Sequence, residues 1–134
     1  MNTSPADISR ILAEAGIKPS TQRIAVMRYL MTHRTHPTAD EIYRALLPDY
    51  PTISRTTVYN TLKLLVEQKC ALMIDIESGN ARYDGTTTPH GHFLCTRCGH
   101  ISDFELSVLP VGPAGTLTTE AHIYYKGLCQ NCQD

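Results

Sequence analysis

The sequence predicts an α+β protein, with an N-terminal winged helix-turn-helix domain and a small C-terminal α/β domain built around four cysteines. Three observations predict this fold class. Apolar residues recur at helical spacing through the first half and are followed by a hairpin pattern. A polar stretch at 85–89 interrupts the chain, and two Cys-x-x-Cys pairs follow it. We therefore expect domains at residues 1–84 and 90–134, joined by a hinge at 85–89.

Helix-start signals divide the first half into four helices. We expect N-terminal caps at Ser20 or Thr21, at Thr38 in a capping box with Glu41, and at Ser54, whose helix should run to about Lys69. The expected buried positions are Ile8, Ile11 and Leu12, then Ile24, Met27, Leu30 and Met31, then Ile42, Leu46 and Leu47, and finally Val58, Leu62, Leu65 and Val66.

Strand patterns occupy the remainder of the chain. Residues 71–76 and 81–83 are expected to form a hairpin around a turn at 77–80, and further strands are expected at 92–95, 101–104 and 118–125. The segment 106–115 contains two prolines and two glycines, so it should not hold a long helix.

Composition restricts the class of protein. The chain has 134 residues, 42% hydrophobic and 19% charged, which is ordinary for a globular protein. No apolar run approaches the roughly 20 residues that span a bilayer, and the N-terminus lacks the basic start and apolar core of a signal peptide. We expect a cytoplasmic protein without membrane contact.

Four of the five cysteines form the strongest chemical pattern. Cys95-x2-Cys98 is followed, after thirty residues, by Cys129-x2-Cys132. Zinc takes four ligands in a tetrahedron, and two intervening residues let both thiolates of a turn face one ion. We predict structural Zn(II); a single redox-active dithiol would not explain the second pair. Cys70 stands apart, and we expect a buried, inert thiol there.

A second group of possible ligands combines histidines with carboxylates. His90 and His92 flank Gly91, Asp84 and Asp103 lie nearby in the sequence, and His36 lies far upstream. Imidazole and carboxylate together suit Fe(II), Mn(II) or Zn(II). A His-x-His pattern is weak by itself, because histidines near surface turns are common.

The fourth predicted helix has a polar face suited to DNA. Asparagine can pair with adenine, threonine can contact a thymine methyl or a phosphate, and lysine can contact a phosphate. The alternative is an ordinary solvated face, and the net charge of −1 gives no general attraction to nucleic acid. The candidate DNA-contacting residues are Arg55, Thr56, Thr57, Tyr59, Asn60 and Lys63.

Several of these stretches, in this order, resemble the ferric uptake regulator family along nearly the whole chain. They are His36-Pro-Thr-Ala-Asp-Glu-Ile-Tyr43, Arg55-Thr-Thr-Val-Tyr-Asn-Thr-Leu62, Arg82-Tyr-Asp84, His90-Gly-His92, Cys95-Thr-Arg-Cys-Gly-His-Ile-Ser-Asp-Phe104 and Cys129-x2-Cys132. The resemblance implies a dimeric bacterial repressor with an N-terminal winged helix, a C-terminal α/β dimerisation domain and a regulatory metal between them.

The peroxide-sensing branch of the family is the most similar. Its regulatory ligands fall on His36, Asp84, His90, His92 and Asp103, and aspartate in the last position is more typical of peroxide sensors than of iron-uptake regulators. The resemblance implies regulatory Fe(II) or Mn(II). It also implies that peroxide oxidises His36 and His90 when the metal is Fe(II).

These observations predict a metal-dependent transcriptional repressor that binds a double-stranded DNA operator as a homodimer, with peroxide as its signal. The first alternative is an iron- or zinc-availability sensor of the same family, and a less favoured one is a thiol redox switch. We do not expect an enzyme, because the chain has no His-Glu-x-x-His and a four-thiolate site is closed to substrate.

The sequence departs from the family pattern in two places. The segment between Asp103 and Cys129 is several residues short, and Pro110, Gly112, Pro113 and Gly115 replace an expected helix. Where the family often has histidine before the last cysteine pair, this chain has Glu120 and Ala121, and His122 lies one place along, facing the other way. A third metal site, present in some members, should be absent or altered.

Overall fold

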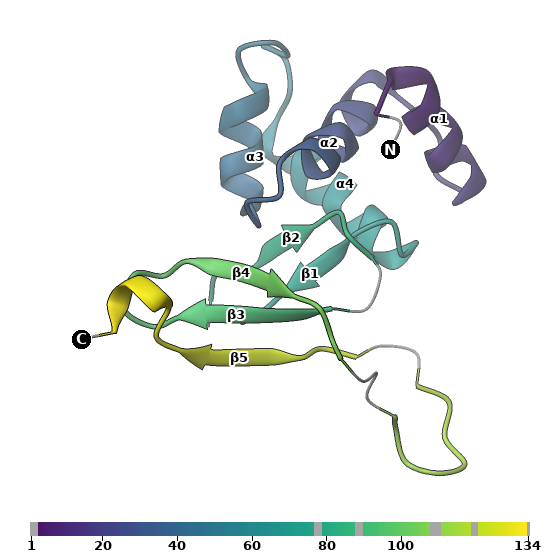
Figure 1. The fold of residues 1–134 in the computed structure, drawn as a ribbon. Coiled ribbons are helices and arrows are strands. Elements are labelled where there is room, and N and C mark those ends of the chain that lie inside the picture. The colour runs from purple at the N-terminus through teal and green to yellow at the C-terminus, as the bar shows by residue number, and fades with distance from the viewer. Residues whose placement is uncertain (1–2, 77–78, 88–89, 108–110, 119–120, 134) are drawn as a thin grey trace. The chain divides into compact units, whose positions relative to one another are not determined.

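In the computed structural model, which describes residues 3–76, 79–87, 90–107, 111–118 and 121–133, the chain divides into two compact units, Met1–Thr87 and Thr88–Asp134. The first unit contains α1 (Pro5–Glu14), α2 (Thr21–Thr32), α3 (Ala39–Leu46), α4 (Arg55–Glu67), β1 (Leu72–Ile74) and β2 (Arg82–Asp84) (Figure 1). The second contains β3 (Gly91–Cys95), β4 (Ile101–Phe104), β5 (Tyr124–Gly127) and a short 3-10 turn (Gln130–Cys132).

Side-chain caps begin the helices where the sequence predicts them. Ser20, Thr38 and Ser54 each accept a hydrogen bond from the backbone amide three residues further on. The Thr38 cap is reciprocal, because the Glu41 carboxylate accepts from the Thr38 amide. The α4 helix ends at Glu67, two residues earlier than expected, and the chain then turns through Lys69 with a φ of 62°.

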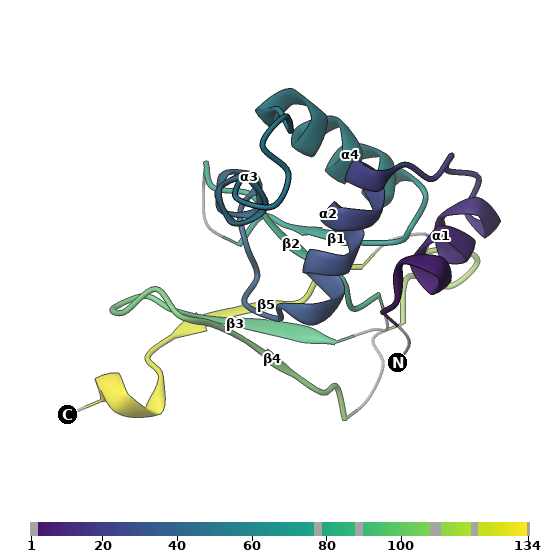
Figure 2. The ribbon, with the colours of Figure 1, turned by 90° about the horizontal axis from the view of Figure 1, so that it is seen from above.

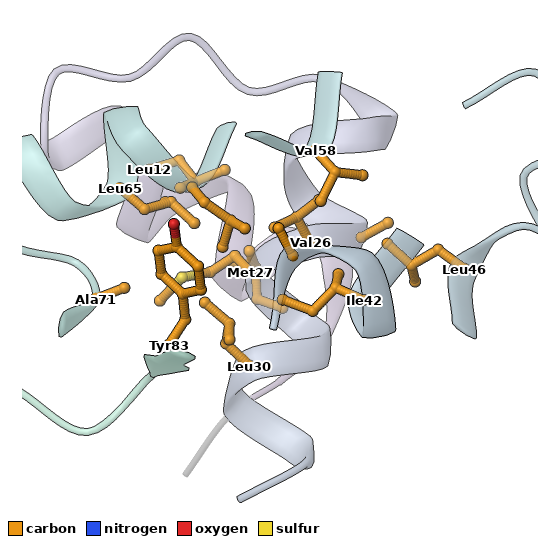
Figure 3. Close-up of a cluster of buried hydrophobic side chains, with 14 of the residues drawn as sticks. Leu12, Val26, Met27, Leu30, Ile42, Leu46, Val58, Leu65, Ala71 and Tyr83 are labelled. Atoms are coloured by element: carbon orange, nitrogen blue, oxygen red, sulfur yellow. The ribbon is translucent and has the colours of Figure 1, made fainter. Parts of the chain in front are cut away.

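The four helices share one hydrophobic core, shown in Figure 3, in which Tyr83 of β2 reaches toward Leu30 and Leu65. Figure 2 shows α2 surrounded by the other three helices, and α2 also contacts β2. Several sides of α2 are therefore covered. Its buried residues are Ala25, Val26, Met27 and Leu30, whereas the expected Ile24 and Met31 are only half-buried.

The wing is the antiparallel pair of β1 and β2, in which Leu72 lies opposite Asp84. β1 is shorter than the expected strand at 71–76, whereas β2 is as long as the expected strand at 81–83 and begins one residue later. The loop before α3 extends this hairpin, because Thr38 forms a bridge with Arg82 and the Tyr83 amide donates to the Pro37 carbonyl at 2.9 Å. The loop that enters α3 is thus fastened to the strand that carries Asp84.

The second unit is a three-stranded sheet with the order β4-β3-β5. β3 pairs antiparallel with β4 and parallel with β5, and Cys95 lies opposite Gly127. β5 begins later than the expected strand at 118–125. Because β5 pairs with β3, the last cysteine pair lies beside the first. In the described parts of 105–118 there is no helix, as the prolines and glycines predict. Pro110 and Glu120 lie outside the described residues.

Among the described residues, no helix has both the length and the apolar character to cross a membrane.

Candidate metal centres and nucleic-acid interface

The four paired cysteines come together in the second unit. Their sulfur atoms all lie within 4.8 Å of one another, and Cys98 Sγ is 3.8 Å from Cys129 Sγ. A tetrahedron with zinc–sulfur bonds of about 2.3 Å has sulfur–sulfur edges of about 3.8 Å. The cluster therefore has the ligand type, the ligand number and the spacing of a structural zinc site.

Two tight turns present these thiols. In the first turn, the Gly99 amide donates to the Cys95 carbonyl at 2.9 Å, and the Cys98 amide approaches Cys95 Sγ at 3.4 Å. Gly99 has a φ of 78°, which a residue with a β-carbon seldom adopts. In the second turn, the Cys132 amide donates to the Cys129 carbonyl at 3.0 Å. Both pairs are thereby arranged by local backbone bonds.

Protons are unevenly shared among the thiols. Backbone amides of Cys98 and Cys129, aimed at the sulfur of Cys95, lower the pKa of Cys95 to about 5. Hydrogen bonds to the sulfurs of Cys129, Cys95 and Cys98 raise the pKa of Cys132 to about 12. The cluster thus holds both negative charge and protons at neutral pH, and a divalent cation would stabilise all four as thiolates.

In the first unit, His36 and Asp84 form a buried pair. His36 Nε2 lies 3.7 Å from Asp84 Oδ2, and both side chains are 4% exposed. Asp84 ends β2, and its Oδ1 accepts from the Thr86 amide at 2.8 Å. The sequence separates these two residues widely, and the loop pairing with β2 brings them together.

In the second unit, His90, His92 and Asp103 converge. The two Nε2 atoms are 3.0 Å apart, and Asp103 Oδ1 lies 3.5 Å from His90 Nε2 and 3.3 Å from His92 Nε2. His92 lies opposite Asp103 in the β3–β4 register, which explains their approach. Two imidazoles and one carboxylate are a donor set typical of Fe(II), and it also accepts Mn(II).

Gly91, between the two histidines, leaves room for the ring of Phe104. The ring of Phe104, which lies opposite Gly91 in the β4 register and is stacked on Tyr125, occupies the space that a β-carbon at residue 91 would need. The sequence pattern identified His-x-His without this steric reason for the middle residue.

The polar face of α4 is accessible. The side chains of Arg55, Thr56, Tyr59, Asn60 and Lys63 are exposed, Thr57 is half-buried, and Val58, Thr61, Leu62 and Leu65 form the buried side. The Arg55 guanidinium lies 4.6 Å from the centre of the Tyr43 ring and pairs with Asp40. Arg55 is therefore oriented by α3 at the start of the candidate recognition helix.

Sequence reasoning did not identify the residues that support the ligands. Arg82 donates to the His36 carbonyl, and the Tyr124 ring packs edge-on against His92. His122 is on the same side of the chain as Tyr124, with Nδ1 3.1 Å from its hydroxyl. Such roles depend on tertiary contacts, so no local pattern indicates them. Cys70, which we expected to be buried, is only half-buried, and the burial it does have raises the pKa of its thiol.

A model of the ferric uptake regulator family matches residues 14–112, which span both the winged helix and the candidate metal ligands of β3 and β4. The chain belongs to this family. A relative from Staphylococcus aureus, the peroxide-responsive repressor PerR, is 38% identical over 129 residues, which cover 92% of this chain and 87% of the relative. The predicted family and fold class are confirmed.

Solved structures of family members are similar over nearly the whole chain. The Campylobacter jejuni peroxide stress regulator has a TM-score of 0.69 and 27% identity, covering 95% of this chain and 97% of that one. The Helicobacter pylori ferric uptake regulator has a TM-score of 0.74, with coverage of 98% and 95%; at 21% identity it shows the shared fold alone. Members of this family are transcriptional regulators rather than enzymes.

Proposed function

We propose that this member of the ferric uptake regulator family is a metal-dependent transcriptional repressor that senses peroxide. The observation that carries the proposal is the convergence of His90, His92 and Asp103 in a chain 38% identical to a peroxide-responsive repressor. The buried pair of His36 and Asp84 supports it from the other unit.

DNA contact is assigned to α4, with Arg55, Thr56, Thr57, Tyr59, Asn60 and Lys63 facing a double-stranded operator. The exposure of this face beside a well-packed core supports the assignment. A recognition helix usually contacts bases through residues near its N-terminus. With a net charge of −1, the chain depends on these local contacts and on bound cations rather than on overall attraction.

We propose that the repressor is a homodimer that acts in the cytoplasm. The C-terminal unit exposes large apolar side chains that a second copy would cover, including Tyr125 at 58% and Leu128 at 40% exposure. Two recognition helices would then meet half-sites about one helical turn apart, which requires a fixed geometry in the dimer.

Two metal sites have different roles in this proposal. Structural Zn(II) on Cys95, Cys98, Cys129 and Cys132 closes the C-terminal unit. Regulatory Fe(II) or Mn(II) is held by His36 and Asp84 from one unit and by His90, His92 and Asp103 from the other. Sharing ligands between the units would fix their relative orientation, and loss of metal would release it and weaken operator binding.

The proposed signal is oxidation of a ligand. Bound Fe(II) supplies the redox chemistry that activates peroxide. The net change inserts one oxygen atom of peroxide into the imidazole of His36 or His90, and the second oxygen leaves as water. An oxidised imidazole is a poorer ligand, so metal and DNA would both be released.

Peptide mass mapping tests this proposal. The zinc-loaded protein is treated with stoichiometric peroxide in its Fe(II) form and, as the matched control, in its Mn(II) form. We expect one added oxygen atom on the peptides that bear His36 or His90 in the Fe(II) form only. Absence of that oxygen would contradict peroxide sensing by this route.

DNA binding separates the proposal from a metal-availability sensor. A duplex enriched from a random pool by the Mn(II)-loaded protein serves as the probe. We expect peroxide to abolish binding by the Fe(II) form and to spare the Mn(II) form. Equal binding before and after peroxide in both forms would indicate a sensor of metal availability instead.

A further inference from the structure

Three consecutive residues of β2 hold the loop that carries His36. Arg82 Nη1 donates to the His36 carbonyl at 2.9 Å, and the Tyr83 amide donates to the Pro37 carbonyl at 2.9 Å. Asp84 Oδ2 lies 3.7 Å from His36 Nε2. The backbone and the ring of His36 are therefore both fixed from the same strand.

The backbone of His36 needs this support. Its φ is 54°, in the left-handed region that residues other than glycine seldom occupy. The following residue is proline, which further restricts the conformations that His36 can adopt. Strained residues of this kind persist where the surrounding contacts over-determine them, and they gather at functional sites.

Arg82 is placed to supply that support. Residues two apart on a strand point to the same side, so Arg82 and Asp84 share one face of β2. The Arg82 side chain is 20% exposed, and its Nη1 also lies 3.6 Å from Oε1 of Glu41, the capping-box residue of α3. A single guanidinium nitrogen thus joins the His36 carbonyl to the start of α3.

We propose that Arg82 is a positioning residue for the regulatory metal. By holding the carbonyl of His36, Arg82 keeps the strained backbone in place and the imidazole beside Asp84 before metal binds. This inference rests on the proposed regulatory site. Residues that orient metal ligands typically change metal affinity by about 10- to 100-fold when substituted.

The test is titration of the full-length, zinc-loaded protein with Mn(II), followed by the electron paramagnetic resonance signal of unbound Mn(II). We expect Arg82→Gln to weaken Mn(II) binding at least about tenfold. Zinc content and the thermal melting curve of the Mn(II)-free protein should match the wild type. Arg82→Lys keeps a charged donor but lacks the planar guanidinium, so it should recover part of the affinity and not all of it.

Two further variants make the result specific. Arg10→Gln removes an exposed arginine that pairs with Asp7 on α1, so it controls for loss of one positive charge and should bind Mn(II) like the wild type. His36→Ala tests the proposed site itself. If His36→Ala binds Mn(II) like the wild type, the proposed ligand set is wrong, regardless of the result for the Arg82 variants.

A folded Arg82→Gln protein with wild-type Mn(II) affinity would overturn the inference. If Arg82→Gln does not retain zinc or melt like the wild type, Arg82→Lys decides. Weakened Mn(II) binding in a folded Arg82→Lys protein then supports a positioning role, and wild-type binding overturns it.

Discussion

Zinc binding at the four cysteines displaces protons, because the metal binds thiolates. The pKa of Cys95, lowered to about 5 by backbone amides, leaves this sulfur ionised at neutral pH. The pKa of Cys132, raised to about 12 by the neighbouring sulfurs, keeps its proton there. We therefore expect the apparent zinc affinity to rise with pH, because zinc must displace the protons that the thiols still hold at neutral pH, whether or not the metal-free unit stays folded.

Calorimetric titration of the reduced, metal-free protein with Zn(II) measures this effect. Two buffers with different protonation enthalpies give the number of protons released at each pH. Net release at neutral pH is expected. An affinity that does not change between about pH 6 and about pH 8, a range in which a thiol with an ordinary pKa is still mostly protonated, would contradict the description of the cluster.

Two side chains on the exposed face of α4 should affect DNA binding differently. Asn60→Ala is expected to relax sequence preference at one position, by about 1–3 kcal/mol of discrimination, because asparagine pairs with a base edge. Lys63→Ala is expected to weaken binding to all sequences and to reduce the salt slope by about one, because lysine contacts phosphate. Fluorescence anisotropy with specific and scrambled duplexes at several salt concentrations measures both.

Arg10→Gln on α1 is the charge-matched control for Lys63→Ala and should leave the salt slope unchanged. If the salt dependence of DNA binding has the same slope in Lys63→Ala as in the wild type, Lys63 does not contact the DNA.

Individual ligands differed in how well the sequence could identify them. The cysteines were predictable because both residues of each pair lie in one tight turn. Two cysteines that are three positions apart in such a turn are also close in space. His36 and Asp84 are 3.7 Å apart but 47 residues separate them, so only the family resemblance indicated that pairing. The role of Arg82 depends on a carbonyl 46 residues away and had no sequence signal.

Among the helices and strands, the N-terminal cap of α4 is expected to affect both stability and DNA binding. Ser54 Oγ accepts from the Thr57 amide at 3.0 Å, at the turn that presents Arg55, Thr56 and Thr57. Ser54→Ala should lower the free energy of unfolding by about 1 kcal/mol, since the first turn loses an acceptor. DNA affinity should fall as well, because that turn would fray.

Ser4→Ala is the matched control. Ser4 caps α1 in the same way, accepting from the Asp7 amide at 3.2 Å. Chemical denaturation followed by circular dichroism should show a similar loss of stability in both variants, whereas anisotropy should show weaker DNA binding only for Ser54→Ala. An equal effect on DNA binding would mean that the cap acts through general stability alone.

Elements were predictable wherever a local signal defines them. Capping residues lie within three positions of the amides they bind, so Ser20, Thr38 and Ser54 marked the helix starts correctly. The predictions of the buried face of α2 and of the start of β5 were less accurate, because both features depend on residues that are distant in the sequence. Several elements cover α2, and the parallel register with β3 places Tyr124 opposite His92.

At the scale of the whole molecule, the two units should respond differently to zinc removal. The first unit has a core drawn from four helices and the wing. Among its described residues, the second unit buries only Leu94, Cys95 and Ile101 as apolar side chains, too few to stabilise a sheet by themselves. We expect a strong chelator with reductant to unfold the second unit while the helical circular dichroism signal of the first persists.

Hydrogen exchange resolved by peptide measures this difference directly. Amides of β3, β4 and β5 should lose protection after zinc removal, and amides of α2 and α4 should keep it. Uniform loss across the chain would show instead that the units fold as one cooperative body.

Regulation by metal involves both units in the proposed function. In the proposed function, ligands from both units bind one ion, so metal binding would fix the orientation of the DNA-binding surfaces and the cation would offset the charge of Asp84 and Asp103. The metal can strengthen DNA binding only as far as it binds the DNA-competent arrangement of the units more tightly than the other arrangements.

Regulation by metal is tested by measuring operator affinity as a function of Mn(II) concentration. Anisotropy of a labelled duplex enriched by the protein is measured for the zinc-loaded chain with and without saturating Mn(II), alongside His36→Ala. We expect Mn(II) to strengthen binding at least about tenfold, corresponding to about 1.4 kcal/mol of coupling, and His36→Ala to abolish the effect. Operator binding that is equally tight without Mn(II) would contradict regulation by metal.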